Sequence, residues 1–426
     1  MNEIKPILVA QCPLFTRSGY GNHSLDLVKS LIRYDKFNVK IVPMRWGSCP
    51  LLPSDNKDLL ELQKYVLTQK LTEPPEVFFQ VSIPNESQPI GKYNIIMTAG
   101  IETTISRAEW IEGMNKMHLC MVPSNHARDV FQRSTFTKQN PNGSKEEIKC
   151  KVPIEVVFEG CDTNVFKKSS DTLVSVNEKL DSLPENFLFL FVGHWLQGDI
   201  GHDRKDVGML VKIFCETFKG QKNMPALVLK TSGATFSVID KYEILKKIDG
   251  IRKTISGEVP NVYLLHGELT DEEMNSLYNH KKVKVHASFT KGEGFGRPLL
   301  EASLSGKPVI ASDWSGHKDF LNKEYAIMLP GEVKQVHPSA VNDFIIKESG
   351  WFTVNYSNAS NVFKDVFDNY GKYLPNAEKL RKENESKFSM TEMDRVLWEI
   401  LDKNVPKFEK RVELVLPKLP KLKKKE

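Results

Sequence analysis

Short apolar runs alternate with amphipathic stretches along most of the chain. The first half opens with an apolar run at 7–10, a glycine-containing turn, a stretch with apolar positions at helical spacing and a second apolar run at 39–43. The second half repeats this order, with an apolar run at 187–192, Gly193 directly after it, and helical spacing over 207–218. An order of strand, glycine turn, helix and strand is typical of doubly wound parallel sheets. The pattern therefore predicts an α/β protein with two such domains.

The length of the chain supports the same division. A chain of 426 residues is too long for one ordinary hydrophobic core. The polar segment 167–184 ends in Leu-Pro and is typical of an interdomain linker, so we expect domains at 1–180 and 181–387. Residues 137–149 are polar and carry no packing signal, which predicts a loop, and the signals over 320–385 are weak.

Composition and charge mainly exclude other classes of protein. The net charge of +5 is small for this length and is no nucleic-acid signature by itself. The six cysteines have no close pairs and fit neither zinc spacing nor a disulfide framework, which indicates a reducing compartment. The longest fully apolar runs are far shorter than the ~20 residues of a membrane span, and the N-terminus lacks signal-peptide architecture. We therefore expect a soluble cytoplasmic protein.

The stretch 283–316 carries the clearest candidate chemistry. A β-rich run ends in the turn Lys-Gly-Glu-Gly-Phe-Gly at 291–296, after which Pro298 fits the first turn of a short helix and Gly306 fits its end. A second strand is predicted at 308–311. Such a strand–turn–helix–strand unit points free backbone N–H groups and a positive helix end toward an anion.

Two glutamates bracket this unit. Glu293 lies in the turn and Glu301 in the first helical turns, with seven residues between them. Carboxylates repel phosphate and suit hydroxyl groups instead, as an acidic residue does with a ribose. The predicted ligand therefore has phosphate in the middle and hydroxyls on both sides, which is the shape of a nucleotide sugar. The alternative is a βαβ unit whose glycines only tighten turns and whose glutamates are solvated.

The wider sequence resembles a known family. The spacing Glu-x7-Glu, with Gly-Lys-Pro-Val-Ile-Ala and Ser-Gly downstream, resembles the signature of the family-4 retaining glycosyltransferases. Three segments of the first half resemble the family in the same order: Glu-Thr-Thr at 102–104, Pro-Ser at 123–124 and Gly-x-Asp-x-x-x-Phe at 160–166. The resemblance implies the GT-B fold, with two Rossmann-like doubly wound domains facing each other across a cleft. It also implies a final helix, at about 388–415, that packs back onto the first domain before a basic tail at 416–426.

The resemblance implies roles for residues on both sides of the cleft. Lys205, with Arg204, would clamp the donor pyrophosphate; basic residues at a helix N-terminus oppose the helix dipole unless an anion binds there. Glu301 would accept hydrogen bonds from the ribose hydroxyls, and Glu293 would contact the donor sugar as a catalytic residue. The other donor-binding candidates are Gly19, Gly21, Gly193, Gly294, Phe295 and Gly296. Thr231, Ser232 and Leu269 would lie around the nucleotide base. For Leu269, packing in the core is an equal alternative.

One position departs from the family pattern. Many members have a histidine after the fourth strand of the first domain, where this chain reads Ala-Gly-Ile-Glu at 99–102. Glu102 is therefore our candidate for the sugar-facing catalytic contact. No Asp-x-Asp occurs in the sequence, whereas a divalent-metal clamp needs closely spaced oxygen ligands. We expect metal-independent transfer with the nucleotide sugar as co-substrate and no further cofactor, and the resemblance implies retention of configuration.

Donor and acceptor stay open. The resemblance implies transfer of a hexose or pentose from a UDP-, GDP- or ADP-sugar to a hydroxyl of a glycan, a lipid-linked acceptor or, as in some viral glycosyltransferases, a modified DNA base. The lysine-rich C-terminus suits DNA or an anionic membrane surface, although such a run is often only a solvated end. A non-catalytic nucleotide-sugar-binding protein and an NAD-dependent oxidoreductase are the other classes. The intact glutamates and Lys205 argue against the first, and the lack of Gly-x-Gly-x-x-Gly after the first strand weakens the second.

Overall fold

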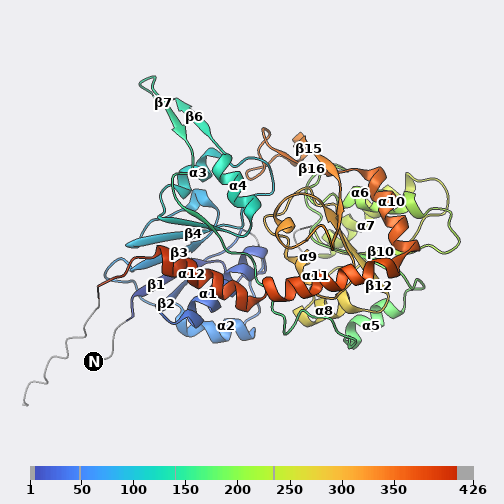
Figure 1. Ribbon diagram of the computed structural model, residues 1–426, viewed down its shortest axis with the longest axis horizontal. Helices are drawn as coiled ribbons and strands as arrows, with labels where there is room; N and C mark the ends of the chain where they lie inside the picture. The colour runs from blue at the N-terminus through green and yellow to red at the C-terminus, as the bar shows by residue number, and fades with distance from the viewer. Residues whose placement is uncertain (1–4, 48, 140, 234–235, 410–426) are drawn as a thin grey trace, which may run out of the picture.

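A computed structural model describes residues 5–47, 49–139, 141–233 and 236–409. The described residues form two α/β halves that lie side by side (Figure 1). Each half contains one six-stranded sheet, and the remaining strands of the described residues form two two-stranded sheets. This confirms the predicted arrangement of two doubly wound domains. No helix within the described ranges combines the length and the apolar character needed to cross a bilayer.

The sheet of the first half is parallel throughout, in the order β2-β1-β3-β4-β5-β8. Its strands are β1 (Ile7–Cys12), β2 (Asn38–Pro43), β3 (Val77–Val81), β4 (Tyr93–Met97), β5 (Leu119–Val122) and β8 (Ile154–Val156). The helices of this half are α1 (Gly19–Tyr34), α2 (Lys57–Leu62), α3 (Ala108–Met114) and α4 (Asn125–Arg133). Every residue of β3 and β5 is buried, because α1 covers one face of the sheet and α3 and α4 cover the other.

The second half is also a parallel sheet, in the order β11-β10-β9-β12-β13-β14. Its strands are β9 (Leu188–Val192), β10 (Ala226–Lys230), β11 (Val262–Leu264), β12 (Val283–Ala287), β13 (Val309–Ser312) and β14 (Ile327–Leu329). The helices are α5 (Val174–Asp181), α6 (Val207–Phe218), α7 (Val238–Lys253), α8 (Asp271–Asn279), α9 (Arg297–Ser303), α10 (Tyr356–Asp368) and α11 (Leu374–Lys387). Side chains of α6, α7 and α10 pack on one face, and those of α5, α8, α9 and α11 on the other.

The strand order of each sheet reverses at one point. In the second half the chain runs outward from β9 to β11 and then returns to place β12 on the other side of β9. In the first half the reversal falls between β1 and β3. Ligands of open α/β sheets bind outside the carboxyl ends of the strands at such a point. The loops after β9, β12, β1 and β3 are therefore where a site is expected.

The last helix returns to the first half. α12 (Met390–Asn404) buries Met393 and Leu397 in the same core as α1. Arg33 of α1 donates two hydrogen bonds of 2.7 Å to the Asp394 carboxylate. Figure 1 shows α11 along the second half and α12 along the first. The predicted basic tail at 416–426 lies outside the described residues.

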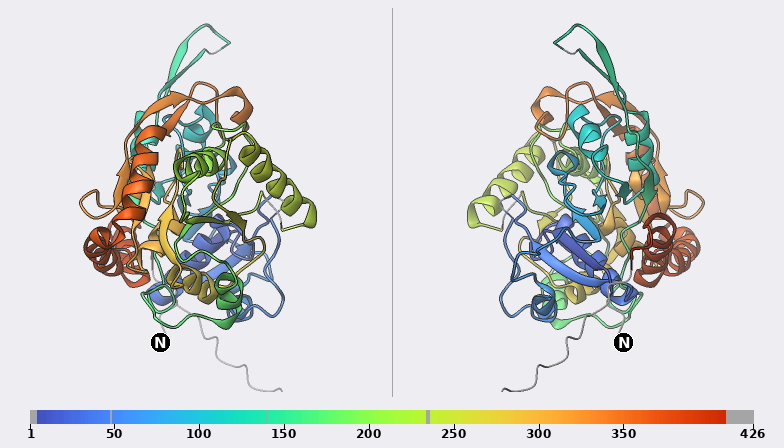
Figure 2. Two further views of the ribbon diagram at one scale, coloured as in Figure 1. Left: turned by 90° about the vertical axis from the view of Figure 1, so that its right-hand side faces the viewer. Right: turned by 90° about the vertical axis from the view of Figure 1, so that its left-hand side faces the viewer.

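Two hairpins were not predicted. Residues 137–149, expected as a loop, contain the antiparallel strands β6 (Phe136–Gln139) and β7 (Lys145–Ile148). This hairpin projects from the first half (Figures 1 and 2), and Ile148 is the one residue of its strands that is buried. The second hairpin pairs β15 (Gly331–Gln335) with β16 (Gly350–Val354). The strands β6, β7 and β15 are largely exposed, so their sequences lack an apolar pattern. β16 is mostly buried, and its Trp351, Phe352 and Val354 were an apolar signal that was missed.

Candidate active site

The fold brings Gly193, Lys205 and Glu293 to the reversal point of the second sheet. Gly193 directly follows β9, and Glu293 lies in the turn between β12 and α9. Lys205 ends the long loop after β9, immediately before Asp206 and helix α6. Glu102 follows β4 in the first half. The residues of the second half lie where the doubly wound topology places a ligand, and Glu102 lies one strand away from the reversal of the first sheet.

A buried ion pair joins two of these loops. The Lys205 ammonium donates a hydrogen bond to Glu293 Oε1, and the two side chains are 10% and 9% exposed. Arg204 Nη1 lies 3.3 Å from Glu293 Oε2 and donates a 3.0 Å bond to the Gly292 carbonyl. Burial opposes ionisation of Glu293, but the charges of Lys205 and Arg204 outweigh it and lower the pKa of Glu293 to about 2. The result is a compact group of two cations and one carboxylate.

Glycines let the second half approach the first. A Cβ at Gly292 would lie 1.9 Å from the Glu102 carbonyl oxygen, and one at Gly294 would lie 2.1 Å from that of Ala99. The Ser124 hydroxyl donates a 2.5 Å hydrogen bond to the Gly294 carbonyl. A larger residue at either of these two glycine positions would push the two halves apart. Here the glycine-rich turn therefore has a visible interdomain role in addition to the predicted one toward the donor.

Glu102 lies beside this group. Its carboxylate is 3.7 Å from Arg204 Nη1, and its side chain is 35% exposed. Arg204 thus contacts a carboxylate from each half. A partly exposed carboxylate beside a buried cation pair is suitably placed to face a ligand at the contact between the two halves.

A second buried ion pair, not predicted from the sequence, holds the two loops from behind. Lys291 Nζ lies 3.1 Å from Asp206 Oδ2, and the side chains are 1% and 0% exposed. Tyr356 OH donates a 2.7 Å hydrogen bond to the same oxygen. The Lys291 backbone N–H donates 2.8 Å to the Arg204 carbonyl. Because Asp206 follows Lys205 directly and Lys291 lies two residues before Glu293, this network fixes the distance between the Lys205 and Glu293 loops.

Replacing Asp206 with glycine should destabilise the protein. Asp206 has φ of 54°, a left-handed conformation in which glycine would recover about 1 kcal/mol. Leaving Lys291 buried without its partner costs about 3–5 kcal/mol, so the free energy of unfolding should fall by roughly 2–4 kcal/mol in urea denaturation. Asp35→Gly is the matched control, because Asp35 has φ of 56° at the exposed end of α1 and its substitution should be neutral or stabilising. An Asp206→Gly variant as stable as wild type would refute the role of the pair.

Glu301 lies in a different cluster. Arg297 Nε donates a 3.2 Å bond to Glu301 Oε1, and Tyr278 OH donates a 3.2 Å bond to Oε2. Arg297 Nη1 donates a 2.6 Å bond to Asp26 of α1, in the other half. Burial raises the pKa of Glu301 to about 7, and Arg297 partly opposes the rise. Each Glu301 oxygen retains a lone pair, so the carboxylate can still accept hydrogen bonds from a ligand.

The predicted base-side residues lie after β10. Thr231 is buried and its hydroxyl has no hydrogen-bond partner among the described residues. The Ser232 hydroxyl lies 3.2 Å from Nδ1 of His194. Burial, then the nearby Lys205 and Arg204 charges, lowers the pKa of His194. His194 was not predicted from the sequence, although its position directly after Gly193 was a usable signal. Leu269 is partly buried and packs against the second-half core.

The remaining candidates are backbone positions. Gly19 and Gly21 lie in the first turn of α1, where Ser18 caps the helix by accepting a hydrogen bond from the Gly21 N–H. Gly296 has φ of 102° and is the N-cap of α9. Phe295 is 2% exposed and its ring packs 4.9 Å from that of Phe320, so only its backbone can meet a ligand.

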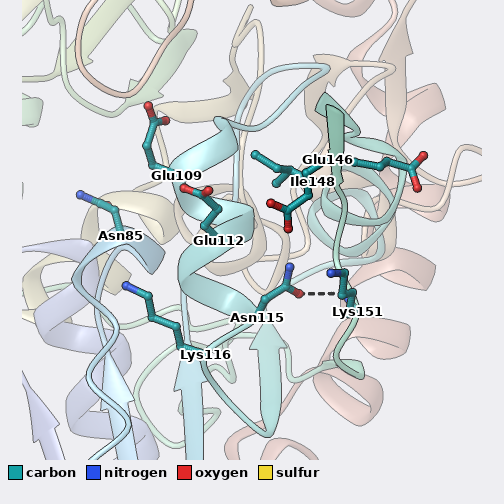
Figure 3. A pocket seen from close by; sticks show the side chains of 9 residues that line it. Asn85, Glu109, Glu112, Asn115, Lys116, Glu146, Ile148 and Lys151 are labelled. Carbon is teal, nitrogen blue, oxygen red and sulfur yellow. Dashed lines mark hydrogen bonds between the residues drawn. The ribbon is translucent and has the colours of Figure 1, made fainter. Parts of the chain in front are cut away.

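Two cavities lie elsewhere on the surface. One, of about 480 Å³, lies between α3 and β7 and contains four glutamates (Figure 3). The other, of about 700 Å³, lies between the β15–β16 hairpin and the loop that contains His202. None of the predicted site residues lines either cavity. The candidate site is therefore defined by the interdomain contacts and not by these hollows.

Comparison with known proteins identifies one segment of the second half. The family model described as glycosyl transferases group 1 matches residues 255–340, a segment that includes Glu293 and Glu301. No curated protein sequence matches the chain.

Solved structures show the same fold over nearly the whole chain. Sucrose-phosphate synthase from Thermosynechococcus elongatus has a TM-score of 0.61 at 12% identity and covers 94% of this chain and 98% of its own. A glycosyltransferase from Rickettsia africae has the same TM-score at 13% identity, with coverage of 94% and 98%. Anabaena HepE in complex with UDP-glucose has a TM-score of 0.60 at 13% identity, covering 93% and 100%. With its segment 255–340 matched to glycosyl transferases group 1 and its two Rossmann-like domains, the chain is a glycosyltransferase of the GT-B fold.

Proposed function

We propose that the chain is a retaining glycosyltransferase of the family-4 type, which moves a sugar from a nucleotide-sugar donor to an acceptor hydroxyl without a metal ion. The observation that carries the proposal is the buried group of Lys205, Arg204 and Glu293 at the reversal point of the second sheet. Nucleotide-sugar use is further supported by the UDP-glucose in the Anabaena structure of the same fold.

Departure of the nucleoside diphosphate is the step that these cations would assist. Negative charge builds up on the leaving diphosphate as its bond to the sugar breaks, and fixed cations in a site shielded from water stabilise that charge strongly. Lys205 and Arg204 would supply two positive charges without the reorganisation that solvent requires. Glu293 would hold both cations in place and face the sugar. Glu102 would approach the sugar from the first domain.

Glu301 would hold the ribose. Its carboxylate is fixed by Arg297 and Tyr278, so its remaining lone pairs have a defined direction. Paired hydroxyls of a ribose are suitable donors to such a carboxylate. The carboxylate also repels phosphate, which favours binding of the diphosphate at the Lys205 end of the site.

A donor panel tests the proposal. The protein is incubated with UDP-, GDP- and ADP-sugars, beginning with UDP-glucose, and release of free nucleoside diphosphate is measured with and without EDTA. Release that EDTA leaves unchanged supports a metal-independent transferase. Binding of a donor without release would indicate a nucleotide-sugar-binding protein. If no nucleotide sugar binds or turns over, the proposal is wrong. The anomeric configuration of the product, read by NMR, decides retention.

Glu301→Ala should lower kcat/KM for the donor about 10²-fold, because hydrogen bonds to a charged group contribute about 1.5–3 kcal/mol each. The fold should persist, since Arg297 retains Asp26 as a partner. Glu272→Ala, an exposed carboxylate on neighbouring α8, is the control and should be neutral. Unchanged turnover by Glu301→Ala would refute the ribose assignment.

A further inference from the structure

Helix α7 exposes a cluster of apolar side chains. Val238 is 84% exposed, Ile239 75%, Tyr242 63% and Leu245 43%, and Phe236 just before the helix is 40% exposed. These five side chains, here called the α7 stripe, are a third of the fifteen exposed large apolar side chains in the described part of the chain. They fall within ten residues of sequence. Singly exposed apolar residues need no explanation, but a contiguous group marks an interaction surface.

The fold does not need the α7 stripe. Ile244, Ile248 and Ile251 are the buried residues of α7 and pack into the core of the second half. Val238, Tyr242 and Leu245 recur at helical spacing on a different side of the helix. The helix therefore has two apolar faces, and folding uses one of them.

Basic residues border the α7 stripe. Over residues 236–253 the sequence has five basic residues against three acidic ones. Asp249 and Lys253 pair with each other, which leaves four basic residues against two acidic ones, and Asp240 already binds the Gly233 N–H and His266. Lys241 and Lys246 are exposed and have no ion-pair partner within the described ranges. The surroundings of the stripe are thus effectively cationic.

We propose that the α7 stripe docks on the surface of a bilayer that contains anionic phospholipid. A helix lying in the membrane interface places its apolar side chains at the boundary of headgroups and acyl chains and its lysines among the phosphates. Aromatic residues such as Phe236 and Tyr242 are favoured at this depth. Each lysine near an anionic surface contributes to binding.

The shape and charge of the α7 stripe disfavour a protein partner. Figure 2 shows α7 at the outer edge of the molecule in both views. A stable protein interface uses about 20–30 residues on each side, far more than five side chains of one helix. A symmetric dimer through this helix would also bring Lys241 and Lys246 of the two copies together. A bilayer deforms around a single helix and does not require a matching groove.

Docking through α7 would place the membrane beside the candidate donor site. Asp240 in the first turn of α7 accepts hydrogen bonds of 2.9 and 3.1 Å from Gly233, the residue after Ser232. His266, after β11, lies 2.8 Å from the same carboxylate. The first turn of α7 is thus fixed to the predicted base side of the site. A lipid-linked acceptor follows if the proposed function holds, whereas the docking itself does not depend on it.

Vesicle co-sedimentation of the full chain tests the docking. The protein should bind vesicles of phosphatidylcholine with phosphatidylglycerol much more tightly than phosphatidylcholine alone, and more weakly as salt rises. Ile239→Ser with Tyr242→Ser should weaken binding at least about tenfold, and Lys241→Ala with Lys246→Ala should do the same for anionic vesicles only. Leu173→Ser with Val174→Ser is the matched control, because these exposed apolar residues lie at the start of α5.

The outcomes separate the alternatives. Loss of binding in both α7 double variants, with the α5 control unchanged, supports the proposal. If both α7 double variants still bind vesicles, the binding arises elsewhere, for example from the lysine-rich C-terminus, and the proposal is wrong. A dimer in light scattering that Ile239→Ser with Tyr242→Ser abolishes, without vesicle binding, would assign the stripe to a second copy instead. Donor turnover in the variants is a separate readout and should be unchanged in solution.

Discussion

Replacing Lys205 with alanine is expected to lower kcat/KM for the sugar donor about 10²–10³-fold, which is the usual cost of removing one group that stabilises charge developing in a transition state. Lys205 and Glu293 are almost fully buried against each other, so water cannot replace the lost charge well. Most of the loss should appear in kcat, because the charge on the departing diphosphate is larger in the transition state than in the bound donor. Nucleoside diphosphate release under saturating and limiting donor measures the two parameters.

Three further variants make the Lys205 result specific. Lys205→Arg should recover part of kcat, because the charge is kept while the geometry changes. Lys212→Ala removes a lysine from the same part of the chain, on α6, and should be neutral. Glu293→Gln should also reduce turnover, since Lys205 and Arg204 would then repel each other without the carboxylate between them. Turnover of Lys205→Ala within about threefold of wild type would mean that the cation does not act on the leaving group.

The two sheets were predictable because their strands are short apolar runs bounded by turns. β9 and β12 were identified from the sequence within a few residues of their bounds. Glu293 became a candidate through its place in a glycine-rich turn and Lys205 through its place at a helix start, together with the resemblance to the family. Two doubly wound sheets then place the residues after β9 and β12 on one edge. The hairpin β6–β7 and the strand β15 escaped prediction for the opposite reason. All five residues of β15 are exposed, so no apolar pattern distinguishes them from a loop.

The partners of the site residues could not be predicted. Lys205 and Glu293 are 88 positions apart, and Arg297 and Asp26 are 271 apart. Local patterns place a residue on an element, but such distant pairs depend on the loop conformations and on how the two halves pack. Lys291 illustrates the limit, since it stood in the recognised turn while its partner Asp206 stood beside Lys205. Both residues lay in segments that the sequence had already singled out, but only the fold shows that they form a buried pair.

Arg297→Met is expected to produce the largest loss of stability. Arg297 is buried between Asp26 of the first half and Glu301 of the second, at 2.6 and 3.2 Å, and burial raises the pKa of nearby Glu159 to about 7, a rise that Arg297 also opposes. Without it three carboxyls share a site with no central cation, so the free energy of unfolding should fall by about 3–5 kcal/mol near neutral pH. Arg395→Met on α12, which removes an exposed arginine paired with Glu392 and Glu399, is the control and should change little.

The pH dependence of this loss has a defined sign. Glu301 and Glu159 have pKa values of about 7 in the folded protein against 4.5 as ordinary values, so between these limits the folded state holds more protons than the unfolded state. Their contribution to stability is present at low pH and is lost as pH rises through about 7. Removing Arg297 raises both pKa values further, so the deficit of Arg297→Met should be greatest above about pH 8 and shrink toward about pH 5. Urea denaturation across this range measures it.

The effect of Asp26→Asn on stability should have opposite signs in the wild type and in the Arg297→Met variant. In the wild type, Asp26→Asn removes a carboxylate that Arg297 binds, and it should destabilise the protein because the guanidinium loses a charged partner between the two halves. In Arg297→Met, the same change removes one of three repelling carboxyls and should stabilise it. This reversal depends on the three carboxyls sharing one cation, and it would not occur if Arg297 acted only by filling space. Equal effects of Asp26→Asn in both backgrounds would therefore show that Arg297 is not the counter-charge of this cluster.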